Sequence, residues 1–199
     1  MNTPSPTAYT PTAKALHWLV AVAALGQLAL GFWMVQLPNT GGGQAQWFNL
    51  HKSIGIVIGL VILLRLGWRL THPAPPLPGH IPAWQRTTAK IVHGSLYACL
   101  VIIPLSGFIG SSVTKYPIRF FGHPLPRWMA ESPAIKEVCS QIHFAAIVVF
   151  ILLIAIHVGK VLKHVLIDRD GTLHRMTWGG APAPKANAAK ELAGSKSPI

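Results

Sequence analysis

Two histidines, His143 and His157, stand at the ends of an uncharged and almost wholly apolar run of thirteen residues. Their spacing of 14 residues is nearly four turns of an α-helix, so both imidazoles lie within about 40° of one helix face. At 1.5 Å per residue they are about 21 Å apart along the axis, whereas the hydrocarbon core of a bilayer is about 30 Å thick. The run therefore predicts a membrane-spanning helix with one histidine a few ångströms inside each membrane surface.

The composition of the chain is typical of a membrane protein. It is 51% hydrophobic and 11% charged, whereas a soluble domain carries about 25% charged residues. Four long apolar segments account for this and predict an all-α membrane protein, a four-transmembrane-helix up-down bundle, with helices at about residues 12–37, 47–70, 88–113 and 133–166. Residues 12–176 then form one four-helix domain, between a disordered lead (1–11) and a disordered basic tail (177–199).

Smaller features agree with this organisation. The first apolar run spans a bilayer and no small-residue cleavage site follows it, so it is not predicted to be a cleavable signal peptide. Gly55 and Gly59 have the spacing that lets a neighbouring helix approach closely. The two cysteines form no C-x-x-C-H signal, which excludes covalent c-type haem.

The formal net charge of +12 does not indicate nucleic acid, because the cations fall in loops and in the tail. Twelve of the seventeen Lys and Arg residues lie on one side of the predicted membrane. The positive-inside rule therefore predicts that both termini are cytoplasmic. The other five, on the outer side, are Lys52, Lys115, Arg119, Arg127 and Lys136.

The up-down topology gives each of four histidines a depth in the membrane. His17 and His157 lie near the cytoplasmic ends of the first and fourth helices, and His51 and His143 near the outer ends of the second and fourth. Ionisable groups inside a bilayer are costly and are functional by default. Two depth-matched pairs on facing helices are what two six-coordinate haems require.

Zinc is the rival metal for these histidines. Zinc sites usually take four close protein ligands, or three and a water, and neither level offers a nearby Cys, Asp or Glu. The paired pattern therefore favours haem. His93 also falls on the cytoplasmic level, so spacing alone leaves open whether His17 or His93 pairs with His157.

Eight short segments carry a further signal: LHW (16–18), HKSIG (51–55), RLGWRLTHP (65–73), HGSLY (93–97), IPLSG (103–107), FFG (120–122), HVGKVLKH (157–164) and DRDGTL (168–173). Together they resemble the bacterial cytochrome b561 family, over about residues 13–176. The resemblance implies a four-helix cytochrome of the bacterial inner membrane that holds two haem b groups.

The resemblance also implies the axial ligands of the haem irons. His17 would pair with His157, and His51 with His143. This choice decides between His17 and His93, which spacing does not, and leaves His93 beside the inner haem or a quinone.

Two histidines on each iron leave no open position, which favours electron transfer over oxygen activation. His164 follows His157 by two turns on the same face. With His93, Arg65 and Arg69 it would either anchor haem propionates or hydrogen-bond a quinone, and for the quinone side His164 and His93 are the candidates. Lys52 and Arg69 are the candidates for binding haem propionates.

The outer cations belong either to a solvated loop or to a field that attracts a small anion. The resemblance implies a family that includes superoxide oxidases, which pass an electron from superoxide to ubiquinone. It thus predicts an oxidoreductase of the superoxide:quinone type, with the lipid bilayer, quinone and superoxide as partners. The alternative is a cytochrome b subunit that links quinone to a partner dehydrogenase or hydrogenase.

Overall fold

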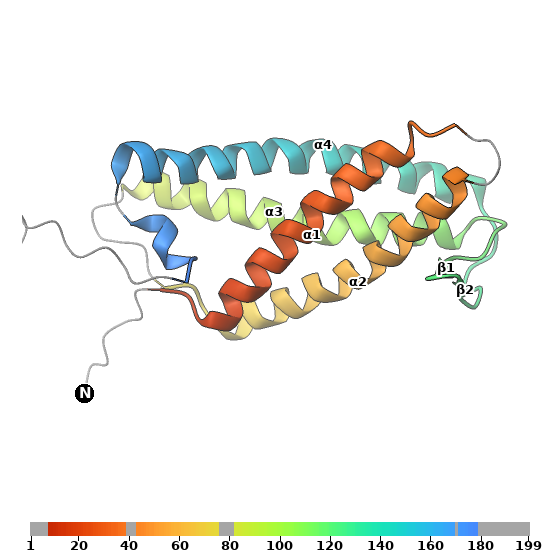
Figure 1. Ribbon diagram of the computed structural model, residues 1–199, viewed down its shortest axis with the longest axis horizontal. Helices are drawn as coiled ribbons and strands as arrows, with labels where there is room; N and C mark the ends of the chain where they lie inside the picture. The colour runs from red at the N-terminus through yellow and green to blue at the C-terminus, as the bar shows by residue number, and fades with distance from the viewer. Residues whose placement is uncertain (1–7, 39–42, 76–81, 170, 179–199) are drawn as a thin grey trace, which may run out of the picture.

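The computed structural model describes residues 8–38, 43–75, 82–169 and 171–178, and it is built from four long helices (Figure 1). Helix α1 spans Pro11–Met34, α2 spans Gly43–Thr71, α3 spans Ala83–Ser112 and α4 spans Pro133–Lys163. Each is long and apolar enough to cross a membrane. Consecutive helices run in opposite directions along the long axis of the molecule. The predicted four-helix up-down bundle is confirmed.

The helix ends differ from the prediction by a few residues. Helix α1 begins at Pro11, inside the predicted disordered lead, because Thr10 caps it by accepting a hydrogen bond from the amide of Ala13. Helix α3 begins at Ala83, five residues before its predicted start. Helix α4 begins at Pro133 as predicted, behind the capping residue Ser132. Most of the predicted lead (1–7) and most of the predicted tail (179–199) lie outside the described residues.

The close helix packing follows the order of the chain: α1 lies along α2, α2 along α3, and α3 along α4. In the part of the chain that the structure describes, α4 does not pack closely along α1 or α2. The predicted histidine pairs lie across this wider space. The two glycines of α2 face different neighbours, because a Cβ on Gly55 would meet Gln27 of α1 at 3.3 Å and one on Gly59 would meet Pro104 of α3 at 3.5 Å.

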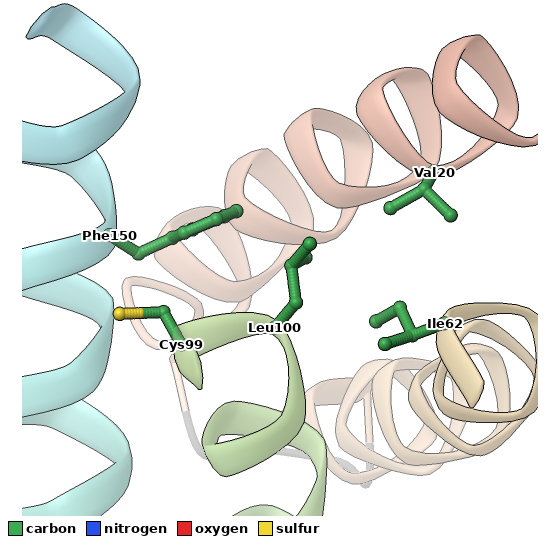
Figure 2. Close-up of a cluster of buried hydrophobic side chains, with 5 residues drawn as sticks. All are labelled: Val20, Ile62, Cys99, Leu100 and Phe150. Carbon is green, nitrogen blue, oxygen red and sulfur yellow. The ribbon is translucent and has the colours of Figure 1, made fainter. Parts of the chain in front are cut away.

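The side chains sort as expected for helices in lipid. Large apolar residues such as Val22, Leu64 and Leu152 are 67%, 67% and 60% exposed on the outside of the bundle, where lipid tails would cover them. The buried apolar side chains in the middle of the bundle form a small group, which we call the central cluster (Figure 2). It consists of Val20, Ile62, Cys99, Leu100 and Phe150.

A short hairpin closes the end of the bundle near His51 and His143; we call this the outer end and the opposite one the inner end, after the predicted orientation. Strand β1 (Arg119–Phe120) pairs antiparallel with β2 (His123–Pro124), and Phe121 and Gly122 between them both have positive φ, as a two-residue hairpin turn requires. Ser53 of α2 fastens this hairpin. Its Oγ lies 2.9 Å from the amide of Phe121 and 3.1 Å from the carbonyl oxygen of Arg119.

The chain after α4 turns back across the inner end of the bundle (Figure 1). A π-helical turn, η1 (His164–Asp168), is followed by a 3-10 turn, η2 (Thr172–Arg175). Lys14 and Trp18 of α1 then donate side-chain hydrogen bonds, both of 2.9 Å, to the carbonyl oxygens of Thr177 and Met176. This segment ties the end of α4 to the start of α1.

Candidate functional site

The outer histidines line one large cavity. It measures about 750 Å³ and is lined by residues of all four helices, including His51 of α2 and His143 of α4. Pockets that hold ligands or cofactors measure about 300–1,000 Å³ and have mostly apolar walls with a few polar groups. The cavity therefore has the size and lining of a cofactor site, and it contains the predicted outer pair.

Helix α3 holds the ring of His143 in a defined orientation. Nδ1 of His143 lies 2.8 Å from the carbonyl oxygen of Ile103 and 3.3 Å from Oγ of Ser106. Since a carbonyl oxygen only accepts, Nδ1 carries the hydrogen and donates it, which leaves a lone pair on Nε2. Ligating histidines commonly donate their other ring nitrogen to a backbone carbonyl in this way. These contacts orient the ring of His143 with its Nε2 lone pair available to a ligand or metal.

A glycine faces each of the two outer imidazoles. A Cβ on Gly31 of α1 would lie 3.2 Å from Cε1 of His51, and one on Gly107 of α3 would lie 3.1 Å from Cε1 of His143. Both distances are shorter than an ordinary van der Waals contact, so a larger residue would push the rings. The glycines leave room for both rings at the cavity wall.

Helix α1 also fastens the turn of α2 that carries His51. Nε2 of Gln27 donates a hydrogen bond to the carbonyl oxygen of His51. Nδ1 of His51 and Oε1 of Gln27 are buried, and neither has a hydrogen-bond partner among the described residues. The two outer histidines are therefore held differently, His143 by its ring and His51 by its backbone.

Three imidazoles meet at the inner end of the bundle. The ring centroid of His157 lies 5.3 Å from that of His93 and 6.4 Å from that of His17. The rings of each pair are edge-on, with interplanar angles of 71° and 62°. The structure therefore brings together the three histidines that depth assigned to the cytoplasmic level.

The geometry does not single out one partner for His157. The ring of His93 is the nearer, yet His93 is exposed, whereas His17 is half-buried, as are His51 and His143. Distance thus favours His93 and burial favours His17. The pairing of His17 with His157 stays a prediction.

Two arginines of α2 bring positive charge to the inner level. Nη2 of Arg65 donates to Nδ1 of His17 at 2.9 Å, and its guanidinium carbon lies 5.1 Å from the ring centroid of Tyr97. The guanidinium of Arg69 lies over the ring of Tyr9, and its buried Nη1 has no hydrogen-bond partner among the described residues. Guanidinium groups only donate, so both suit an acceptor such as a carboxylate.

His164 opens the π-helical turn at the end of α4. Its Nδ1 lies 3.3 Å from Oδ2 of Asp168, and the same oxygen accepts from Nζ of Lys163 at 2.6 Å. Single π-helical turns are frequent at functional sites. His164, two turns beyond His157, thus lies beside a carboxylate that also binds an ammonium group.

The predicted outer cations fall into two groups. Lys52 and Lys136 line the same cavity as the outer histidines. Lys115, Arg119 and Arg127 belong to the loop between α3 and α4, where Nη2 of Arg127 donates to the carbonyl oxygen of Thr114 at 2.9 Å.

The outer site fits a haem on three observations. Two imidazoles and two lysines line a cavity of cofactor size, glycines make room for the rings, and His143 has a free lone pair on Nε2. The described residues contain no cluster of three or more His, Cys, Asp or Glu side chains that could hold a bare metal ion. At the inner level the fit is partial. Nδ1 of His17 accepts from Arg65, so ligation through Nε2 requires Arg65 to move this hydrogen bond to another acceptor.

Four apolar helices around a haem-sized cavity, with histidines at two levels, define the class of membrane-bound b-type cytochromes. A profile of the prokaryotic cytochrome b561 family matches residues 8–179. The chain is 36% identical over 176 residues to cytochrome b561 homolog 2 of Escherichia coli (strain K12), which covers 87% of this chain and 93% of the relative. It is 26% identical over 171 residues to cytochrome b561 homolog 1 of the same organism, covering 84% of this chain and 96% of that relative.

The chain belongs to the prokaryotic cytochrome b561 family. It is accordingly a multi-pass membrane cytochrome that binds haem b and transfers electrons. The predicted family, the transmembrane helices and the electron-transport function are confirmed at this level.

Sequence reasoning did not find several residues of the outer site. Gly31 and Gly107 are glycines in the interior of apolar helices, and Gln27 is a lone amide side chain in an apolar span. An isolated glycine inside a helix costs stability and usually has a packing or functional reason. That signal was present in the sequence, but it does not say which ring each glycine faces.

Proposed function

We propose that the protein holds two haem b groups and carries single electrons from superoxide at the outer membrane face to ubiquinone. The observation that carries this proposal is the presence of histidines at two levels of one helix, His143 beside a haem-sized cavity and His157 within 6.4 Å of two further imidazoles. One helix thus contributes a side chain to each of two sites, about 21 Å apart along its axis.

His51 and His143 are the proposed ligands of the outer iron, and His17 and His157 those of the inner iron. Haem b, when bound, supplies one-electron iron chemistry with both axial positions filled. Lys52 lines the outer cavity and is proposed to bind a propionate there.

Arg65 and Arg69 are proposed to bind the propionates at the inner level. The buried Nη1 of Arg69 has no hydrogen-bond partner among the described residues. An oxygen of an anionic group would accept its hydrogen bond. Arg65 would exchange its hydrogen bond with His17 for one to a carboxylate, which frees the ring of His17 to turn.

The quinone is proposed to bind at the inner end, against His164. The His164–Asp168 contact offers a proton donor and acceptor beside each other, which a quinone needs because its reduction consumes protons. His93 is the second candidate, on the side of α3. The ring centroid of His93 lies 5.3 Å from that of His157, and His164 follows His157 by two helical turns.

The outer cations support an anionic reductant. Lys52 and Lys136 line the cavity itself, and three further cations lie in the adjoining loop. A cleft lined by one sign of charge raises the local concentration of a small ion of the other sign. Together with the positive-inside count, this supports an outer site for superoxide and a cytoplasmic location of both termini.

The haem content of the purified chain tests the di-haem part of the proposal. We expect two b haems per chain, and loss of one from each of the alanine variants of His17, His51, His143 and His157. His93→Ala should keep both. Loss of haem from His93→Ala together with full retention in His17→Ala would show instead that His93 is the partner of His157.

Rapid mixing with superoxide tests the proposed electron transfer from superoxide to ubiquinone. We expect superoxide to reduce the haems and added ubiquinone to reoxidise them, with slower reduction in a variant in which Lys115, Arg119 and Arg127 are changed to Gln. No reduction by superoxide would reject the enzyme proposal. Copurification of a soluble dehydrogenase or hydrogenase that reduces the haems would favour the alternative, a cytochrome b subunit of a larger complex.

A further inference from the structure

One layer of apolar side chains separates the two levels of histidines. This layer is the central cluster, to which each helix contributes at least one residue (Figure 2). Ile62, Leu100 and Phe150 of the cluster also line the outer cavity. The cavity therefore ends at the central cluster.

The inner face of the central cluster adjoins the inner histidines. Val20 follows His17 by three residues on α1, and Ile62 precedes Arg65 by three residues on α2, so each is about one helical turn from a group of the inner level. The cluster thus lines the outer cavity on one side and lies about one helical turn from groups of the inner level on the other.

Phe150 lies at the midpoint of this arrangement. It follows His143 by seven residues and precedes His157 by seven, which is two turns each way, so the three side chains share one face of α4. About 10 Å of helix axis separates Phe150 from each histidine. Its side chain is 5% exposed and points into the bundle, toward Leu100 of α3 (Figure 2).

We infer that the side chain of Phe150 fills the path between the two haem sites and thereby supports electron transfer between them. This inference rests on the proposed di-haem function. His51 and His143 would hold one haem and His17 and His157 the other, and these groups would supply one-electron chemistry, so that a single electron would pass from the outer site to the inner one with no bond broken and no proton moved. Superoxide supplies this electron and ubiquinone finally takes it up.

Phe150 affects the rate of electron transfer because its ring fills space between the two haem sites. Electron tunnelling slows when part of the path between two redox groups is empty space rather than packed atoms. Protein interiors are packed as densely as organic crystals, and a void leaves the atoms at its edge without contacts on one side. The ring of Phe150 is the largest side chain of the central cluster and fills the middle of this gap.

Pulse radiolysis of the purified di-haem protein tests the inference. A one-electron reductant made by the pulse reduces one haem, and the redistribution of the electron is followed by the separate absorption bands of the two haems. The variants are Phe150→Ala, which opens a void, Phe150→Leu, which fills most of it, and Leu152→Ala as a control on the lipid-facing side of the same helix. Haem content and the electron paramagnetic resonance spectrum of each oxidised haem are recorded for every variant.

We expect two haems and unchanged axial-ligand spectra in all three variants. Redistribution should be several-fold slower in Phe150→Ala than in the wild type, intermediate in Phe150→Leu, and unchanged in Leu152→Ala. Equal rates in Phe150→Ala and Leu152→Ala, with both haems present, would overturn the inference. If Phe150→Ala loses haem, Phe150→Leu decides: an intermediate rate supports the inference and a wild-type rate overturns it. A wild-type protein with fewer than two haems would instead reject the proposed function itself.

Discussion

At the scale of single residues, the outer site depends on small side chains as much as on histidines. Gly31 leaves just enough room for the ring of His51, because a Cβ there would be 3.2 Å from Cε1. Gly26, on the same helix, has nothing within 4 Å of an added Cβ. An added Cβ would therefore reach the site at Gly31 but not at Gly26, so Gly26 serves as a control position on the same helix.

We expect Gly31→Ala to weaken haem binding at the outer site. The methyl group would push the ring of His51 by a few tenths of an ångström, and axial ligands tolerate little displacement. Gly26→Ala should keep both haems and stabilise the helix by about 0.5–1 kcal/mol. Haem content and the resonance spectrum of the outer haem check this, and equal spectra in the two variants would contradict it.

The histidines of the site were predictable, whereas their supporting contacts were not. The depth of His143 and His157 follows from counting residues along an apolar helix, and the structure brings each to a level with other histidines. The bond from His143 to the carbonyl oxygen of Ile103 depends on how α3 and α4 face each other. Nothing in one sequence fixes the rotation of two uniformly apolar helices about their axes.

At the scale of elements, helix existence was easier to predict than helix ends. The apolar runs predicted the four spans. Helix α1, however, begins one residue earlier than predicted, behind the cap at Thr10, and α3 begins five residues earlier, at Ala83. The π-helical turn at His164–Asp168 carries no signal in the apolar pattern. It is held by the contacts of Asp168 with Lys163 and His164, which arise only once the chain leaves α4.

The hairpin at the outer end depends on one buried hydroxyl. Ser53 is 1% exposed and contacts both Arg119 and Phe121. Phe121 has a φ of 47°, which is uncommon for a residue other than glycine and needs support from its surroundings. The contact with Ser53 supplies part of that support.

We expect Ser53→Ala to destabilise the protein by about 1 kcal/mol, because it leaves the part-buried amide of Phe121 without its partner. The loop between α3 and α4 should also become easier to cleave by protease. Thr71→Ala is the control, since it removes a hydroxyl that contacts the backbone at an exposed helix end. Thermal unfolding in detergent and limited proteolysis check the comparison, and equal behaviour of the two variants would show that Ser53 does not hold the hairpin.

At the scale of the whole molecule, the distribution of Lys and Arg predicts which level of histidines lies near the cytoplasm and which near the outer side of the membrane. Of the Lys and Arg residues that the structure describes, nine lie at the end of the bundle that carries His17 and His157, and five at the end with His51 and His143. Lys and Arg are retained on the cytoplasmic side of a membrane. The larger cavity, with its two lysines, would therefore open toward the outer side, away from the cytoplasm.

Cysteine labelling in intact spheroplasts checks this orientation. The native Cys99 and Cys139 are buried, so a membrane-impermeant maleimide should not label the wild type. Glu131→Cys places a thiol in the loop before α4, and Trp178→Cys places one after η2, where the side chain is 64% exposed. We expect the first variant to be labelled in intact spheroplasts and the second only after the membrane is permeabilised. The opposite pattern would put the outer cavity in the cytoplasm, and superoxide from the outer side would then have no path to the cations that are proposed to attract it.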